Sequence, residues 1–423
     1  MPLVRYTFLL LALPLQAQVT SDTIVRVELL GRTSLESVEF AAVETSVTVI
    51  VDGDLRGRIE LGESVTLVGR GGLVQLDGRD VGVSAADIVL DGSRFILRAG
   101  DTVRTYEGDL HVTSTDGHLE LVNHVRMAPY VASVVASELG FDVLEANKAQ
   151  AILARTYAAR RLGQNEHFDV HDHTGSQVYK GAATVTPVSR NAALFTSGQV
   201  LTYQGDLADA YYHSSSGGHT ASNENIWNGN PVPYLRAVPD PYDRGAPDHR
   251  WETSADRQAV LSALSARYGG RVQGIEVVSR TPSDRIHRVR LIGADRSEIS
   301  GNQLRSAINA RLGWRTVRST KVDITVEGDR YVFRGAGFGH GVGMSQYGAM
   351  GQAREGRTYR QILSHYFSGT EVSGGAAMVA PVQIADSRQA SSTRRYAPPQ
   401  RIIRDRTRDE PPRSLTRTRR TAW

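Results

Sequence analysis

The stretch that decides the fold is Pro129-Tyr-Val-Ala-Ser-Val134-Val135-Ala-Ser-Glu138-Leu-Gly140, where the pattern of the chain changes from strands to helices. Proline suits the first turn of a helix, the valines recur at helical spacing, and Gly140 provides a stop. Glu138 lies on the stripe of Val134 and Val135. An apolar setting disfavours a charged carboxylate and raises its pKa, which is the property that a general acid needs. The alternative is a glutamate at a helix end that reaches solvent.

Before this stretch, residues 20–126 have the pattern of strands. Val25, Val27 and Leu29 alternate with polar residues, and Asp-Gly dipeptides such as Asp52-Gly53 and Asp116-Gly117 separate the runs. This pattern predicts antiparallel β structure, as a meander or a small barrel. We find no chemistry in this part.

After the stretch, a second helix is expected from Leu144 to Arg161, with many alanines that permit close packing. Lys148 and Arg155 are seven residues apart and therefore share one face. Two cations on one face usually mark a solvated surface. Lys148, however, is one of only three lysines in the chain, which suggests that this position prefers an ammonium group.

Two loops further along concentrate polar and glycine residues. The first runs from Tyr211 to Trp227 and combines hydroxyls, imidazoles and aromatic rings, which suit hydrogen bonding and stacking on sugars. The second, from Gly335 to Gly348, is so rich in glycine that a ligand or another chain segment must approach its backbone closely. It is neither a phosphate loop nor a nucleophile elbow.

The composition narrows the function classes. The 423 residues carry a formal net charge of +4 and have 40% hydrophobic and 22% charged residues, as in soluble proteins of two or three domains. The absence of cysteine excludes disulfides, thiolate metal sites, iron–sulfur clusters and cysteine nucleophiles.

The two ends of the chain differ from the rest in composition. Residues 1–17 have a basic, an apolar and a small-residue region in the order of a secretory signal peptide, which predicts export to the periplasm, cell wall or medium; the alternative is a short buried strand. The apolar run is too short to span a bilayer, and no later segment is long enough. Residues 386–423 hold eleven arginines and four acidic residues, which predicts a disordered tail of net charge +7. This tail either attracts anionic polymers or is simply solvated.

Taken together, the motifs resemble the stage II sporulation protein D (SpoIID)/LytB amidase-enhancer family. The resemblance rests on Tyr130 to Leu139, Ala146 to Ala158, His213 to Gly218 and Gly339 to Ala349, which occur in register over roughly residues 22–373. It implies an α+β fold, with a β-rich part at 20–126 and a mixed helical and β region with a substrate groove at 127–373.

The resemblance also implies peptidoglycan chemistry. Members of the family are lytic transglycosylases that cut the MurNAc–GlcNAc linkage, preferably in strands without stem peptides, and leave a 1,6-anhydro-muramyl end. The family's catalytic glutamate matches Glu138, which would act first as an acid and then as a base. The residues implied to bind the glycan are Lys148, Gln150, Arg155, Tyr157, His213, Ser214, Ser216, Glu224, Trp227, His340, Ser345, Gln346 and Tyr347.

The family's zinc site is the point at which this sequence departs. Some members have cysteines before the segment that matches Gln177 to Tyr179, whereas this chain has His171, His173 and the nearby His167. These imidazoles could form only a weaker substitute. We therefore expect no cofactor and activity without metal, although zinc is not excluded.

Two functions from different classes remain open. The first is a lytic transglycosylase, and the second is a non-catalytic enhancer that binds glycan strands or a cell-wall amidase. A serine hydrolase that uses Ser215 or Ser345 is a distant third, because no matching His and Asp order supports it. We expect no specific nucleic-acid partner.

Overall fold

The computed structural model describes residues 19–77, 83–85, 87–227 and 229–375. Within these ranges the chain has eight α-helices and six sheets, so the predicted α+β class is confirmed. The predicted signal peptide (1–17) and arginine-rich tail (386–423) lie outside the described residues. In the described part of the chain, no helix is long and apolar enough to span a bilayer.

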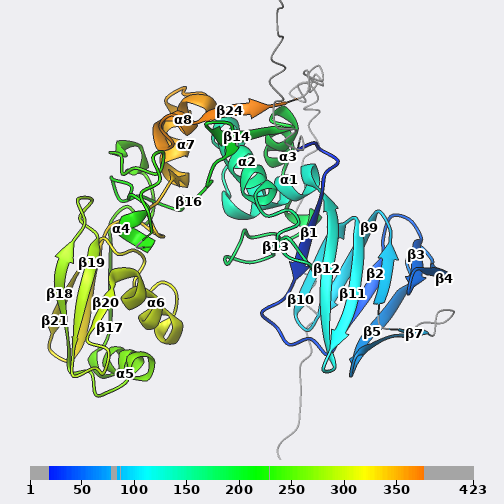
Figure 1. The fold of residues 1–423 in the computed structure, drawn as a ribbon, viewed down its shortest axis with the longest axis horizontal. Coiled ribbons are helices and arrows are strands. Elements are labelled where there is room, and N and C mark those ends of the chain that lie inside the picture. The colour runs from blue at the N-terminus through cyan, green and yellow to red at the C-terminus, as the bar shows by residue number, and fades with distance from the viewer. Residues whose placement is uncertain (1–18, 78–82, 86, 228, 376–423) are drawn as a thin grey trace, which may run out of the picture. The chain divides into compact units, whose positions relative to one another are not determined.

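The N-terminal part consists of two sheets built almost entirely from antiparallel pairs, coloured blue to cyan in Figure 1. Alternate residues such as Val25 and Val27 are buried in a shared apolar core, as their period of two predicts. The antiparallel prediction is confirmed, but the arrangement is not one meander or one closed barrel, because β2 pairs with β5 and β9 instead of its chain neighbours.

The first sheet contains, in spatial order, β13 (Val170–His171), β1 (Ile24–Leu29), β12 (His118–Arg126), β11 (Asp109–Thr115), β8 (Asp87–Asp91), β3 (Val47–Val51) and β4 (Asp54–Ile59). The second contains β10 (Thr102–Glu107), β9 (Arg94–Ala99), β2 (Ser37–Ala42), β5 (Ser64–Arg70), β6 (Leu73–Asp77) and β7 (Val83–Ala85).

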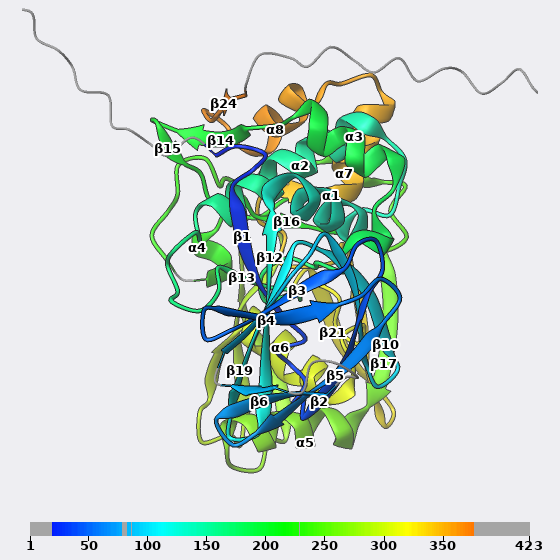
Figure 2. The ribbon, with the colours of Figure 1, turned by 90° about the vertical axis from the view of Figure 1, so that its right-hand side faces the viewer.

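A group of helices follows without a linker, since β12 ends at Arg126 and α1 begins at Met127. Helix α2 packs against α1, α3, α7 and α8, and Figure 2 shows these helices together. The short elements here are β14 (Gln199–Tyr203), β15 (Asp206–Leu207), β16 (Tyr212–His213), α4 (Glu224–Trp227), β23 (Met344–Ser345), β24 (Glu371–Gly374) and the 3-10 turns Ala182–Thr184 and Pro241–Asp243. The helices are α1 (Met127–Glu138), α2 (Leu144–Ala159), α3 (Pro187–Phe195), α7 (Gln346–Arg354) and α8 (Tyr359–Tyr366).

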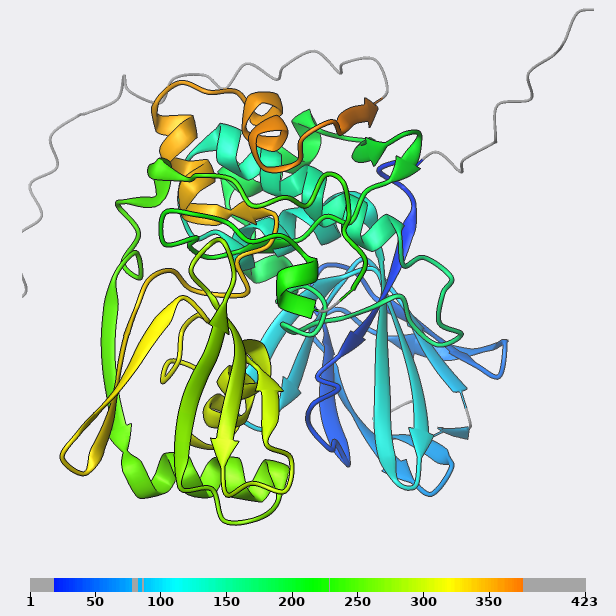
Figure 3. The same ribbon diagram turned by 60° about the vertical axis from the view of Figure 1, so that its left-hand side comes forward.

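A third part, between the two polar loops, has its own apolar core. Two helices accompany two three-stranded sheets, which are drawn in yellow-green shades in Figure 3. The elements are β17 (Trp251–Asp256), α5 (Arg257–Tyr268), β18 (Gly274–Arg280), β19 (Ile286–Ile292), β20 (Glu298–Ser300), α6 (Gly301–Leu312), β21 (Val322–Glu327) and β22 (Arg330–Gly335).

The glycine-rich loop is approached by another segment of the same chain. A Cβ atom at Gly343 would lie 2.1 Å from the carbonyl oxygen of Tyr211, and one at Gly339 would lie 2.9 Å from the Cβ of His213. Both glycines also have positive φ, at 72° and 107°. Of the two explanations that the sequence leaves open, chain packing accounts for these positions, and it brings the two polar loops together as the parallel pair β16 and β23.

Candidate functional site

The site is centred on Glu138, the last residue of α1. Its Oε1 accepts hydrogen bonds from the backbone N–H of Val178 at 2.8 Å and from the phenol of Tyr212 at 3.2 Å. Helix α1 ends there because Leu139 is its C-cap and Gly140 adopts positive φ. Both bonds end on Oε1.

Hydrogen bonds behind Glu138 fix its phenol partner. Gln177 Nε2 donates to the Tyr212 hydroxyl at 3.2 Å, and Gln177 Oε1 accepts from the hydroxyl of Tyr130 at 2.9 Å. Tyr130 is fully buried on α1, so the series of bonds begins and ends on one helix. Such a connected network holds each member in one orientation.

Burial raises the pKa of Glu138 above its ordinary value. The hydrogen bonds from Val178 and Tyr212, the amide of Gln346 and the positive charge of Lys180 act in the opposite direction and limit the rise. The C-terminal end of α1 also carries the negative end of the helix dipole, which disfavours a carboxylate. Glu138 therefore keeps its proton to a higher pH than an exposed glutamate does, and the same hydrogen-bond donors stabilise its anion once the proton leaves.

Gln346 brings an unused hydrogen-bond donor to this carboxyl group. It is the first residue of α7, its side chain lies near enough to lower the pKa of Glu138, and it is 6% exposed. Its Nε2 nevertheless completes no hydrogen bond within the described residues. A buried amide without a completed hydrogen bond costs free energy.

The residues on either side of Tyr212 belong to a cluster of rings, which we call the aromatic cluster: Tyr211, His213, Trp227 and His340. The ring of His340 lies 5.2 Å from Trp227 and 5.5 Å from His213, and Tyr211 lies 4.7 Å from Trp227. Trp227 is 40% exposed, so the cluster presents an apolar ring to solvent.

The two histidines of the cluster are neutral near pH 7. Burial is the main cause that lowers the pKa of His213 well below its usual range and that of His340 to about 4. His213 Nδ1 faces the carbonyl oxygen of Val342 at 3.2 Å and therefore carries the proton, so its buried Nε2, which has no partner, is an acceptor. Adjacent residues join the two halves of the site, since Tyr212 contacts Glu138 and His213 contacts His340.

The serine-rich loop is held by Asp243, which is fully buried. Its Oδ2 accepts from the hydroxyls of Ser215 at 2.7 Å and Ser216 at 3.1 Å, while its Oδ1 lies 2.9 Å from His249 Nδ1. Ser345 is the N-cap of α7, where its Oγ accepts from the N–H of Gly348. None of these hydroxyls is hydrogen-bonded to a histidine in the described residues, so these contacts give no support to a serine nucleophile of the Ser-His-Asp kind.

Several residues that the resemblance implies lie in structural contacts. Lys148 Nζ pairs with Glu145 at 2.6 Å, and Glu224 pairs with Arg236 at 2.7 Å. The ring of Tyr157 lies under the guanidinium of Arg161 at 3.4 Å. These contacts are all within the chain, and a role for these side chains in binding glycan stays a prediction.

Arg155 lies inside the helical core. It is 1% exposed, and it donates to the carbonyl oxygens of Gln199 and Ala193 and to the hydroxyl of Thr196. Burial lowers the pKa of Arg155 to about 10. With three partners near the end of α3, this guanidinium stabilises the junction of α2, α3 and β14.

The remaining candidates are Gln150, Ser214 and Tyr347. Gln150 is fully buried in α2, and neither polar atom of its side chain has a partner in the described residues. The carbonyl oxygen of Ser214 accepts the N–H of Tyr347 at 3.0 Å, and the Tyr347 ring contacts Phe141. Ser214 and Tyr347 therefore help to hold the serine-rich loop against α7.

The three histidine candidates for metal binding do not form a complete ligand set. The His171 Nδ1 is hydrogen-bonded to Glu28, and the rings of His171 and His173 are stacked 4.8 Å apart. His173 Nδ1 accepts from the N–H of Gly175, and His167 is exposed. Over the described ranges, no group of three or more His, Cys, Asp or Glu side chains is arranged to hold a metal ion.

Residue reasoning missed the direct partners of Glu138. Val178 contributes only a backbone N–H, which no sequence pattern reveals, and Tyr212 belongs to a two-residue strand without periodicity. The sequence pattern that could have pointed to these partners is the density of polar and aromatic residues around Gln177 and Tyr212.

The fold and the site define an α+β protein in which a carboxyl group at a helix end has a raised pKa and accepts a hydrogen bond from a tyrosine whose chain neighbours belong to an aromatic cluster. In comparisons with known proteins, residues 115–203 match the family of stage II sporulation proteins (SpoIID), and residues 242–343 match a domain of unknown function. The chain belongs to the SpoIID/LytB family.

Three relatives illustrate this membership. The chain is 30% identical over 270 residues to the stage II sporulation protein D of Bacillus subtilis, covering 60% of this chain and 76% of that protein. It is 29% identical over 296 residues to an uncharacterized protein of Brachyspira hyodysenteriae, covering 69% and 78%. It is 31% identical over 280 residues to the amidase enhancer of Bacillus subtilis, covering 54% and 38%.

Proposed function

We propose that the protein is an exported peptidoglycan lytic transglycosylase that cleaves MurNAc–GlcNAc linkages, preferably in strands stripped of stem peptides, with Glu138 as acid and base. The observation that carries the proposal is the carboxyl group of Glu138, whose pKa is raised by burial while two donors hold its Oε1. A general acid must keep its proton near neutral pH and still be stable as an anion.

In the first step, Oε2 of the protonated Glu138 gives its proton to the glycosidic oxygen as the bond from C1 of MurNAc to that oxygen breaks. The carboxylate then takes the proton of the muramyl 6-hydroxyl as that oxygen bonds to C1, which closes the 1,6-anhydro ring. The proton returns to Glu138 and no water is consumed. A hydrolase needs a second carboxylate to activate water or to attack, but this reaction does not.

The chain's other groups would hold the glycan. The groups that lower the pKa of Glu138 are an amide N–H, a phenol, an amide side chain and an ammonium group, and none of them is a second carboxylate. The free Nε2 of Gln346 suits a sugar hydroxyl or acetamido oxygen, and the exposed ring of Trp227 suits the face of a pyranose.

We further propose that cleavage needs no bound metal. His171 is engaged with Glu28, and the acid and base steps both use the carboxyl group of Glu138. Activity should therefore persist after dialysis against a chelator. Loss of cleavage on chelation, with recovery on addition of zinc, would contradict this part of the proposal.

The second candidate function is that of a non-catalytic enhancer, which binds glycan or a cell-wall amidase and raises amidase activity. It is favoured by the 31% identity to the amidase enhancer of Bacillus subtilis. Fold and binding surface serve either role, so the two functions must be separated by product analysis.

The test uses purified wild type, Glu138→Gln and the matched control Glu120→Gln, which changes an exposed glutamate of β12. Each is incubated with stripped glycan strands, and the products are analysed by mass spectrometry. Wild type and Glu120→Gln should release anhydro-muramyl ends, and Glu138→Gln should release at least a hundredfold less. No product from wild type would contradict the enzyme, and equal product from Glu138→Gln would contradict the role of Glu138.

A further inference from the structure

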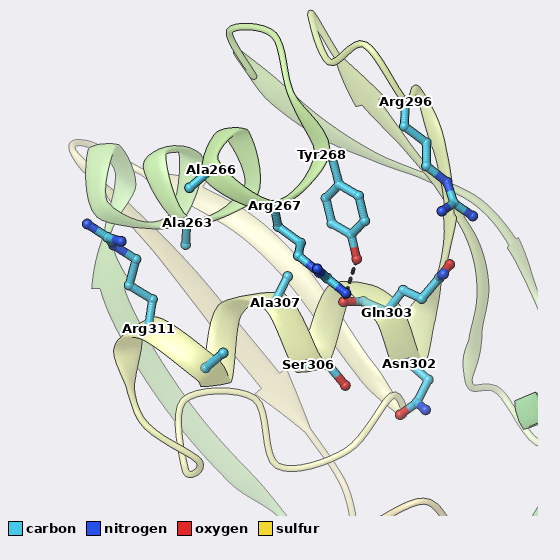
Figure 4. Close-up of a pocket in the computed structure, with 11 residues that line it drawn as sticks. Ala263, Ala266, Arg267, Tyr268, Arg296, Asn302, Gln303, Ser306, Ala307 and Arg311 are labelled. Carbon is cyan, nitrogen blue, oxygen red and sulfur yellow. Dashed lines mark hydrogen bonds between the residues drawn. The ribbon is translucent and has the colours of Figure 1, made fainter. Parts of the chain in front are cut away.

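A groove lies between α5 and α6, away from the residues discussed so far. The two helices pack side by side, and the space between them has a volume of about 930 Å³. Alanines line it from both helices: Ala263 and Ala266 on α5, Ala307 and Ala310 on α6. Figure 4 shows Ala263 and Ala307 directed toward the facing helix.

Three arginines lie along this groove. Figure 4 shows Arg311 toward one end, Arg296 toward the other and Arg267 between them. All three are exposed, and none forms an ion pair with a described residue. Neither helix contains an aspartate or glutamate. Asp295 lies against Gly269 and Gly270, yet the groove keeps an excess of positive charge.

The other groups of the groove are suited to neutral polar ligands. Asn302 and Ser306 on α6 present an amide and a hydroxyl, which both donate and accept hydrogen bonds, while Gln303, whose Oε1 accepts from the N–H of Ser300, offers its amide N–H groups. Tyr268 donates its hydroxyl to the carbonyl oxygen of Gln303 at 3.1 Å, which fixes the ring at one end of the groove.

We propose that this groove binds an anionic glycan strand, with strand carboxylates on the three arginines, hydroxyl and acetamido groups on Asn302, Gln303 and Ser306, and sugar faces on the alanine floor. Guanidinium groups pair with carboxylates through two parallel hydrogen bonds. A stripped peptidoglycan strand carries one free lactyl carboxylate on each muramyl residue. The choice of this polymer rests on the proposed function.

Charge and chemistry argue against other occupants. The chain's own segment 386–423 has a net charge of +7, so it is repelled by a groove of the same sign. A polymer that carries only phosphates could accept hydrogen bonds from the amide and hydroxyl side chains of α6, but it has no apolar sugar face for the alanines. An acidic protein or a phosphodiester polymer is therefore an alternative outcome of the test.

The test measures the affinity of full-length protein for fluorescently labelled stripped strands at fixed ionic strength. All proteins carry Glu138→Gln, so that no strand is cut. The groove variant adds Arg267→Gln, Arg296→Gln and Arg311→Gln, and the control adds Arg58→Gln, Arg70→Gln and Arg354→Gln, three exposed arginines elsewhere with the same change in charge. The groove variant should bind at least tenfold more weakly at an unchanged melting temperature, and the control should bind normally.

The same measurement with modified ligands identifies the occupant. Strands whose lactyl carboxylates are converted to amides should bind the parent protein as weakly as native strands bind the groove variant. Equal affinity of the parent and groove variants for native strands would overturn the proposal. Tighter, groove-dependent binding of polyphosphate or polyglutamate would overturn the assignment to a glycan.

The outcome is separable from that of the proposed function. Proteins with Glu138 intact are assayed in parallel for release of anhydro-muramyl ends. Cleavage without groove-dependent binding would overturn only this inference. Groove-dependent binding without cleavage by the wild type would overturn only the transglycosylase.

Discussion

The phenol of Tyr212 donates a hydrogen bond to Oε1 of Glu138 across 3.2 Å, and the same oxygen of Tyr212 accepts from Gln177. Tyr212 therefore has a fixed direction in which to donate. Its strand neighbour His213 contacts His340, so one two-residue strand connects the carboxyl group to the aromatic cluster.

Replacement of Tyr212 by phenylalanine tests this relationship. In the wild type, the hydrogen bond from Tyr212 stabilises the anion of Glu138. Its removal should therefore raise the pKa of Glu138 further and move the alkaline limb of the cleavage profile to higher pH. The maximal rate should fall about tenfold, because the anion formed in the first step loses one donor. Cleavage is measured from pH 4 to pH 9.

The matched control is Tyr359→Phe, which removes a hydroxyl bonded to Gln199. It should leave both the rate and the profile unchanged. A Tyr212→Phe profile that stays in place, or moves to lower pH, would contradict the direct bond to Glu138.

The Gln346→Met variant should lose cleavage activity without losing thermal stability. Methionine keeps about the same volume but removes the unpaired Nε2, so the folded protein should melt no earlier than wild type. Cleavage should fall about tenfold through a higher KM, because this nitrogen is proposed to bind the glycan, and the pKa of Glu138 should rise, because the amide of Gln346 lowers it. Gln352→Met is the control on the same helix, because its Nε2 also lacks a partner, although this change removes the acceptor of a weak hydrogen bond from Arg357 as well. Loss of activity in both variants, or in neither, would argue against a ligand at Gln346.

The parts of this site that could be predicted are local in sequence. Helix α1 and the position of Glu138 on its buried stripe follow from the spacing of Val134 and Val135 and from Gly140, which all act within one helix. The structure begins the helix at Met127, ahead of Pro129, because β12 leads into it directly.

The other parts of the site could not be predicted, because they depend on pairing between segments that are distant in the sequence. The parallel pairing of β16 with β23 places Tyr212 beside Met344, and no periodicity in two-residue strands encodes that register. The same limit explains Arg155, whose partners at Ala193, Thr196 and Gln199 are carbonyls and a hydroxyl that only tertiary packing brings to it.

Arg155→Leu should therefore act on stability. It would leave the buried carbonyl oxygen of Ala193 and the partly buried one of Gln199 without this donor, at a cost of about 2–4 kcal/mol in the free energy of unfolding. The melting temperature should fall by several degrees, and the KM of the protein that remains folded should stay near that of wild type. A normal melting temperature with a raised KM would instead assign Arg155 to glycan binding.

Asp240 should make the stability of the protein depend on pH. It is fully buried, and burial together with the nearby charge of Asp243 raises its pKa to about 6. Because this value lies above the ordinary 3.8, the folded protein holds the proton more tightly than the unfolded chain does. The resulting stabilisation, about 3 kcal/mol, is complete below about pH 4 and is lost as the pH rises through about 6.

Asp240→Asn removes this titration, since asparagine stays neutral and its amide oxygen can still accept from Tyr366. The variant should therefore gain stability relative to wild type as the pH increases, by about 3 kcal/mol between pH 4 and pH 8. Urea unfolding at the two pH values measures the difference. The control is Asp116→Asn, at an exposed hairpin position. Its free energy of unfolding should differ from that of wild type by the same amount at both pH values. If Asp240→Asn behaved in the same way as this control, the buried carboxyl group of Asp240 would be ionised throughout, and the unpaired Oδ2 would need a cationic partner that the described residues do not provide.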